Sequence, residues 1–242
     1  MALPVIAITN ESTVLTDDQV RAVLPALSKQ VTNDFRAYWG VDASLVFLPK
    51  GEALTDGWWQ IVILDDPDQA GALGYHELSS VGSPLGKIFA RLDLQAGSSW
   101  TVTLSHELLE MLGDPEIDTC KQAADGKFYA LEVSDAVEAD NLGYQIDNVL
   151  VSDFVTPRWF NDQVECDRYS FKQNVTKPLE LAPGGYISVF DNGQWSQLTE
   201  QALLASGREM AAAAQTVHPG SRRDRRIRRL GVIGWPWKVS VR

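Results

Sequence analysis

Apolar residues in the first part of the chain follow the spacing of strands and helices in turn. Residues 5–8 form a short apolar run typical of a strand. Between Thr16 and Tyr38, apolar positions recur every three or four residues after a capping-box pattern, which predicts a long helix that ends before Gly40. Four later β-rich runs predict further strands: residues 44–48, 58–64, 72–78 and 87–92.

A second strong helix is predicted at residues 99–112, where apolar side chains dominate and Gly113 and Pro115 end the pattern. Short β-rich runs follow at residues 129–133, 144–146, 149–154 and 186–190, and residues 199–215 have the alanine-rich pattern of another helix. The pattern therefore predicts an α/β fold with a mixed, mostly parallel sheet. The long N-terminal helix is expected on one face, the helix at 99–112 beneath the sheet, and an irregular, β-containing part after them.

The helix at residues 99–112 carries the motif HExxE. Its four-residue spacing places His106 and Glu110 on one helix face, with Glu107 beside them. The motif differs by one residue from HExxH, in which two histidines bind zinc and the glutamate handles a proton. Because a carboxylate replaces the second imidazole and the chain contains three histidines in all, the remaining ligands are expected to be carboxylates.

The motif and the element order together resemble the zincin metallopeptidases over roughly residues 1–160. The resemblance is carried by SHELLE at 105–110 and GDP at 113–115. The chain is most similar to a set of zincin-like proteins from phages and bacteria. That set shares three further segments, which match residues 132–138, residues 151–160 and Gly74-Tyr75-His76.

This resemblance implies a metal-dependent hydrolase in which His106 and Glu110 bind the metal. Glu107 would act as the catalytic base toward a metal-bound water. His76 is expected either near the site, on the substrate side, or as a structural histidine. Zinc is the expected metal, although oxygen-rich ligation also suits calcium or manganese, and the alternative is a metal-free hydrogen-bond network.

The third metal ligand is open among four carboxylates. Asp114 lies eight residues after His106, about 12 Å along an unbroken helix, and reaches the metal only if the chain turns back. Glu132 and Asp135 match the acidic stretch of the similar set, and Glu116 has the spacing of the third ligand in one zincin branch. Glu132 ranks first, Asp135 and Asp114 follow, and Glu116 is last.

Charge is distributed unevenly along the chain. The formal net charge is -11, yet residues 221–242 contain eight basic side chains against Asp224 alone. This tail is therefore about +7 and the remainder about -18, a balance that disfavours nucleic-acid binding by the body of the protein. With its arginines, Trp235 and Trp237, the tail is predicted to dock on an acidic protein surface, such as a neighbouring copy, an assembly partner or its own body.

Two classes of function follow from these observations. The first is a zinc metallopeptidase-like hydrolase that acts on a protein or peptide. The second is a non-catalytic structural or interaction protein, for example a phage-particle component, that retains a zincin scaffold. Neither a membrane span nor a signal peptide is visible, so a cytoplasmic or virion-associated protein is expected. The expected organisation is a zincin-like domain at 1–160, a packed extension at 161–220 and the basic tail at 221–242.

Overall fold

The computed structural model describes residues 3–68, 73–161, 168–200 and Arg226. The fold is mixed α/β, as the hydrophobic pattern predicts. The chain forms two compact units, the first from Met1–Pro115 and Asp140–Asp153 and the second from Glu116–Ala139 and Phe154–Arg242. The domain division at residues 160 and 220 stays a prediction. Within the described ranges, no helix is both long and apolar enough to cross a membrane.

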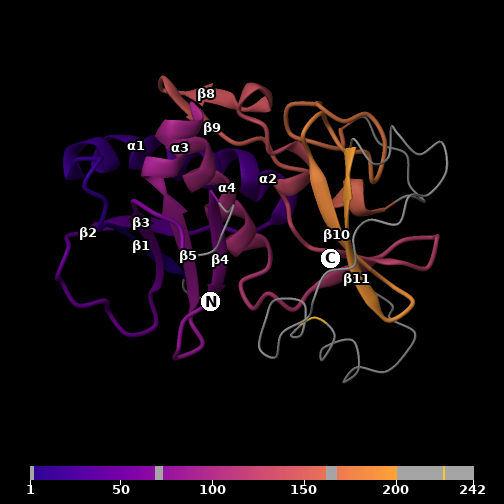
Figure 1. Ribbon diagram of the computed structural model, residues 1–242, viewed down its shortest axis with the longest axis horizontal. Helices are drawn as coiled ribbons and strands as arrows, with labels where there is room; N and C mark the ends of the chain where they lie inside the picture. Colours follow the sequence, from indigo (N-terminus) through magenta and orange to yellow (C-terminus); the bar gives the residue numbers. More distant parts are fainter. Residues whose placement is uncertain (1–2, 69–72, 162–167, 201–225, 227–242) are drawn as a thin grey trace. The chain divides into compact units, whose positions relative to one another are not determined.

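A five-stranded sheet forms the centre of the first unit (Figure 1). Its strands are β1 (Val5–Asn10), β2 (Ser44–Leu48), β3 (Trp59–Leu64), β4 (Gly74–Leu78) and β5 (Pro84–Phe89). In the order β2-β1-β3-β5-β4, neighbouring strands are parallel except for β4, which runs antiparallel to β5 at the edge. The isoleucines of β1 and β3 are fully buried, as expected for central strands.

The long N-terminal helix is present and contains an irregularity that apolar spacing does not predict. It runs through α1 (Asp17–Lys29), a π-helical segment (Gln30–Phe35) and α2 (Arg36–Trp39). The capping box between Thr16 and Gln19 begins it. Gly40, in the left-handed conformation with φ of 70°, ends it. Both predicted ends of the helix are therefore confirmed.

The strand predicted at residues 87–92 is correct only as far as Phe89. From Ala90 the chain forms helix α3 (Ala90–Ala96). The neighbouring strand β3 pairs with β5 up to Leu64↔Phe89 and then ends, so a longer β5 would have no partner there. Arg91 instead turns back to bind Asp65 and Asp66, the two residues that follow β3.

Helix α4 (Trp100–Gly113) contains the HExxE motif and is buried along almost its whole length. It contacts β4 and β5 of the sheet and strand β9 of a hairpin. That hairpin, β8 (Tyr144–Ile146) and β9 (Val149–Val151), lies over the helices in the view of Figure 1. The Ser152 N–H donates to Ser105 Oγ at 2.6 Å, which fixes the chain after the hairpin to the helix. The motif is thus enclosed by the sheet and the hairpin.

The second unit contains a four-stranded antiparallel sheet in the order β11-β10-β7-β6. Its strands are β6 (Cys120–Gln122), β7 (Phe128–Ala130), β10 (Tyr186–Asp191) and β11 (Gln194–Thr199). The apolar pattern predicts β7 and β10 approximately but misses β6, which has three residues, and β11, which is mostly polar. Thr199 belongs to β11, and residues 201–215 of the predicted last helix lie outside the described residues.

The N-terminus of α4 is held by an acidic side chain, Asp140, whose substitution tests how much this contact stabilises the helix. Asp140 Oδ2 accepts the Ser99 N–H at 2.6 Å, next to the positive end of the helix dipole. Asp140→Ala should lower the free energy of unfolding by about 1 kcal/mol, and Asp140→Asn, which keeps an acceptor, should lower it less. Urea unfolding measures both. Equal stability of Asp140→Ala and the unaltered protein would contradict this role.

Candidate metal centre

Helix α4 brings together three of the residues that the sequence singles out. His106, Glu107 and Glu110 are all buried, and one ligand atom from each lies within 4.8 Å of the others. His106 Nε2 is 3.3 Å from Glu110 Oε1, across one turn of the helix. The HExxE spacing therefore places an imidazole and a carboxylate side by side, as the helix geometry requires.

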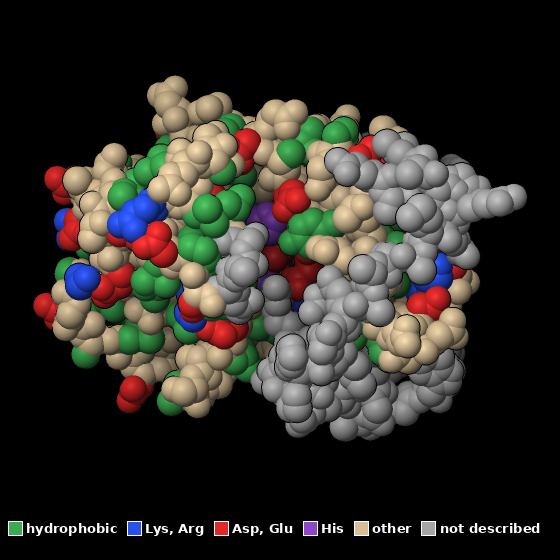
Figure 2. Space-filling view, in the orientation of Figure 1, with side chains coloured by type: hydrophobic (Ala, Val, Ile, Leu, Met, Phe, Trp, Pro, Cys, Tyr) green, Lys and Arg blue, Asp and Glu red, His purple; other side chains and the backbone are tan. Residues whose placement is uncertain are grey.

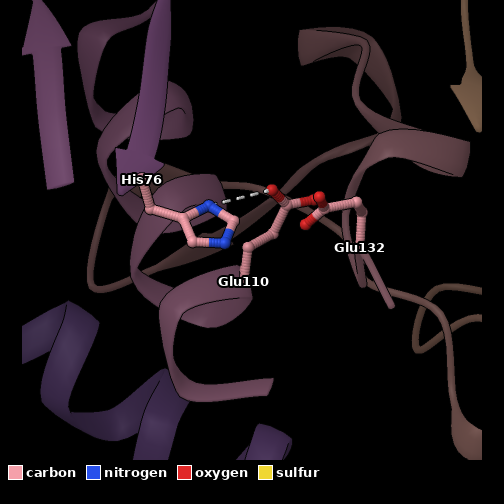
Figure 3. A group of neighbouring side chains, drawn as sticks. All are labelled: His76, Glu110 and Glu132. Atoms are coloured by element: carbon pink, nitrogen blue, oxygen red, sulfur yellow. Dashed lines mark ion pairs between the residues drawn. The ribbon is translucent and has the colours of Figure 1, made fainter. Parts of the chain in front are cut away.

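His76 places a second imidazole beside the two glutamates of this group. It lies on β4 with 1% of its surface exposed. Its Nδ1 is 3.3 Å from Glu107 Oε2 and 3.6 Å from Glu110 Oε2, and Figure 3 shows its ring facing Glu110. The carboxylate of Glu110 thus meets one imidazole at each oxygen. Figure 3 also draws Glu132, which belongs to the second unit.

Gly74 permits this arrangement because it has no side chain. A Cβ at this position would lie 2.8 Å from Thr103 Cγ2 and 3.0 Å from Glu107 Cγ, which is closer than packed atoms allow. Since residues two apart in a strand face the same side, Gly74 and His76 both face α4. The close approach of β4 to α4 is therefore what lets the His76 ring reach the carboxylates of the helix.

The first-unit carboxylate Asp114 is buried and follows the end of α4, where its N–H donates to the Glu110 carbonyl. Among the described residues it is not part of the ligand group of His106, Glu107 and Glu110. Its backbone turns out of the helix there, with φ of -139°. That Asp114 binds the metal therefore stays a prediction.

The other three predicted ligands belong to the second unit. Asp135 begins a short 3-10 turn and is buried, whereas Glu116 is exposed. Glu132 is also buried, and its Oε1 accepts a hydrogen bond from Arg226 Nη2 at 2.9 Å. Their roles as ligands of the metal stay predictions, and Glu132, which ranks first, has a cationic partner within its own unit.

Arg226 is the one residue of the basic tail that the structure describes. Its side chain is 2% exposed and pairs with a carboxylate of its own chain. This contact agrees with the expectation that the tail's arginines seek an acidic protein surface. The tail's other arginines and its tryptophans lie outside the described ranges, so docking on a second copy or on another protein stays a prediction.

A further buried acid supports α4 from the neighbouring helix α3. Asp93 is fully buried, and its Oδ1 accepts a hydrogen bond from Thr103 Oγ1 at 2.9 Å. Burial raises the pKa of Asp93 to about 7; the Thr103 hydrogen bond opposes this shift and the charge of Asp140 adds to it. Sequence reasoning misses Asp93, because an acid in a short amphipathic segment is usually solvated.

Surface carboxylates of the first unit form ion pairs with lysine and arginine side chains. Figure 2 shows acidic side chains scattered over the visible face, several of them beside Lys or Arg side chains. Lys87, for example, lies 2.7 Å from Asp68 and 2.9 Å from Glu77. These contacts connect Lys87 of β5 to the loop after β3, which contains Asp68, and to the edge strand β4, which contains Glu77. They distinguish the paired surface acids from the buried acids of α4, whose neighbours are imidazoles.

Substituting Gly74 by alanine tests the close approach of β4 to α4. The new Cβ would collide with Thr103 Cγ2, so the free energy of unfolding should fall by about 1–3 kcal/mol. Thr103→Ser removes that methyl group and keeps the hydroxyl, so it should recover most of the loss in the double variant. Denaturant unfolding of the four proteins measures the coupling. Simple additivity of the two changes would show that the strand does not press on the helix at this point.

Asp93→Asn tests the buried acid. An acid whose pKa is raised from 3.8 to about 7 makes the protein less stable as the pH rises between these values, because the folded state binds the proton more tightly. The difference corresponds to a loss on the order of 4 kcal/mol, complete above pH 7. Asp93→Asn should therefore be more stable than the unaltered protein at pH 8, and the two should converge near pH 4. Thermal unfolding of both proteins between pH 4 and pH 8 measures this difference. If their stabilities change with pH in parallel, the pKa of Asp93 is not raised.

No protein-family model, curated protein or solved structure matches this chain. The candidate centre is therefore defined by its own geometry. Its elements are one helix with a histidine and two glutamates, and one edge strand with a second histidine packed against them.

Proposed function

We propose that this protein is a metal-dependent hydrolase with a zincin-like fold. The observation that carries the proposal is the buried group of His106, Glu107 and Glu110, whose ligand atoms lie within 4.8 Å of one another. Support for the fold comes from the order of the elements, in which the motif helix follows a five-stranded mixed sheet and packs on its edge strand.

The donor set fits a divalent metal such as zinc. Two atoms that bind one tetrahedral zinc at 2.0–2.1 Å are about 3.3–3.4 Å apart. The distance from His106 Nε2 to Glu110 Oε1 is 3.3 Å. Burial adds to the argument, because buried carboxylates need a cation or strong hydrogen-bond donors close by. The imidazoles favour zinc over calcium, which prefers oxygen ligands alone.

The chemistry divides between the metal and the helix. A zinc ion held by His106 and Glu110 would lower the pKa of a bound water and polarise a carbonyl group of the substrate. Glu107 lies next to His106 on α4 and would accept the proton of that water, then pass it to the leaving group. In the structure the Glu107 carboxylate is held by Nδ1 of His76.

Glu132, Asp135 and Asp114 are the carboxylates proposed from the sequence to complete the ligand set. One imidazole with two carboxylates donates more negative charge than two imidazoles with one carboxylate. Such a metal would be a weaker Lewis acid, so hydrolysis with this set should be slow. Protein or peptide substrates are proposed on the resemblance to zincins.

A non-catalytic interaction protein with a zincin-like scaffold is the second candidate. The contact between Glu132 and Arg226 favours it, because a carboxylate bound to a buried guanidinium is withdrawn from metal binding. In this case the histidines and glutamates of the centre would form a hydrogen-bond network without a metal. The basic tail would then serve assembly with another protein or a second copy.

Glu107→Gln separates the two functions. Glutamine keeps the size of the side chain but cannot accept the proton, so hydrolysis of a broad peptide library should fall by about 10²–10⁴-fold. Metal content, measured by elemental analysis, should not change. Glu77→Gln on β4 is the matched control, because Glu77 pairs with Lys87 on the partly exposed edge of the sheet.

Full activity in Glu107→Gln would remove Glu107 from the mechanism. A zinc-loaded, unaltered protein that cleaves nothing in the library would favour the second candidate. Purified protein that binds no zinc even when the metal is supplied would exclude the hydrolase proposal.

A further inference from the structure

We propose that His76 is a metal ligand, so that two imidazoles and Glu110 hold the ion. This inference rests on the proposed function and deepens it, because the HExxE motif contains a single histidine. The imidazole that HExxH places on the helix would here come from the edge strand β4. The expectation of carboxylates alone beside His106 would then be wrong for one ligand.

The contacts of Glu110 carry the argument. Its Oε1 lies 3.3 Å from His106 Nε2, and its Oε2 lies 3.6 Å from His76 Nδ1. Each oxygen of one carboxylate thus faces a different imidazole nitrogen. Both distances are close to the roughly 3.3–3.4 Å expected between neighbouring ligand atoms on one zinc ion. These contacts are those expected if both oxygens of Glu110 bind the ion and one imidazole binds it on each side of the carboxylate.

The position of His76 fits a ligand better than a group on the substrate side. The side chain is almost completely buried, and its nitrogen points at the two glutamates of α4. Pairing of His76 with Gly86 in β5 holds the strand in register, and Gly74 lets it approach the helix. A ligand needs this kind of fixed backbone, because its ring must keep one orientation toward the ion.

The charges of the group point the same way. Glu107 and Glu110 are both buried, and buried carboxylates need a cation or hydrogen-bond donors close by. A divalent cation would supply this positive charge, and it binds imidazoles in their neutral form. With Nδ1 of His76 bound to the ion, Glu107 would no longer share this nitrogen and would be available as the base.

Two imidazoles with one glutamate form one of the ligand sets that catalytic zinc sites use. Compared with the set proposed from the sequence, one carboxylate is exchanged for a neutral ligand. An ion held by this set would keep more of its positive charge and would be the stronger Lewis acid. His76 would therefore act on the acidity of the metal rather than on the substrate.

X-ray absorption spectroscopy of the zinc-loaded full chain tests this directly, because imidazole ligands give a distinct multiple-scattering signal. We expect one zinc per chain with two imidazoles in the unaltered protein and one imidazole in His76→Gln. Competition with a chelating dye should show zinc binding weakened by more than about 100-fold in His76→Gln, beyond the 10–100-fold cost of losing an outer-shell partner. His218→Gln, which alters the remaining histidine, is the matched control and should change neither result.

A zinc ion with a single imidazole in the unaltered protein would overturn the role of His76 while the hydrolase proposal stands. Two zinc ions per chain, each with one imidazole, would overturn it as well. A protein that takes up no zinc would overturn both proposals. If His76→Gln does not fold, the spectrum of the unaltered protein alone decides between one imidazole and two.

Discussion

The packing of the edge strand β4 against helix α4 is the constraint on which the candidate centre depends. At Gly74 the two elements are so close that even a methyl group would meet Thr103 and Glu107. Two residues further along the same strand, this closeness places the His76 ring against both glutamates of the helix. The second imidazole is therefore supplied by a backbone approach that glycine permits.

Buried charge explains why these side chains are held so firmly. Two carboxylates and two imidazoles share an interior region where ionised groups are costly unless they are paired. Either a metal ion or a network of hydrogen bonds can satisfy the carboxylates. The two proposed functions differ in this choice: the hydrolase uses a metal, and the interaction protein keeps the cluster as a hydrogen-bonded structural group.

The acids of the chain fall into groups with different physical roles. Those at the surface of the first unit bind lysine or arginine, and Asp140 holds the N-terminus of α4. In the second unit Glu132 binds Arg226, so part of the imbalance between the acidic body and the basic tail is resolved within the chain. Buried Asp93 differs from both groups, because its raised pKa makes it sensitive to pH near neutrality.

By itself, the sequence determined the features that depend on near neighbours in the chain. Apolar spacing and capping residues located the long first helix and the motif helix, and the HExxE spacing put His106 and Glu110 on one face. Tertiary structure decided the rest. Strand β5 ends at Phe89 because its partner ends, and His76 meets Glu110 because β4 pairs antiparallel to β5 and packs on α4. Such contacts join distant parts of the chain, so no local pattern in the sequence records them.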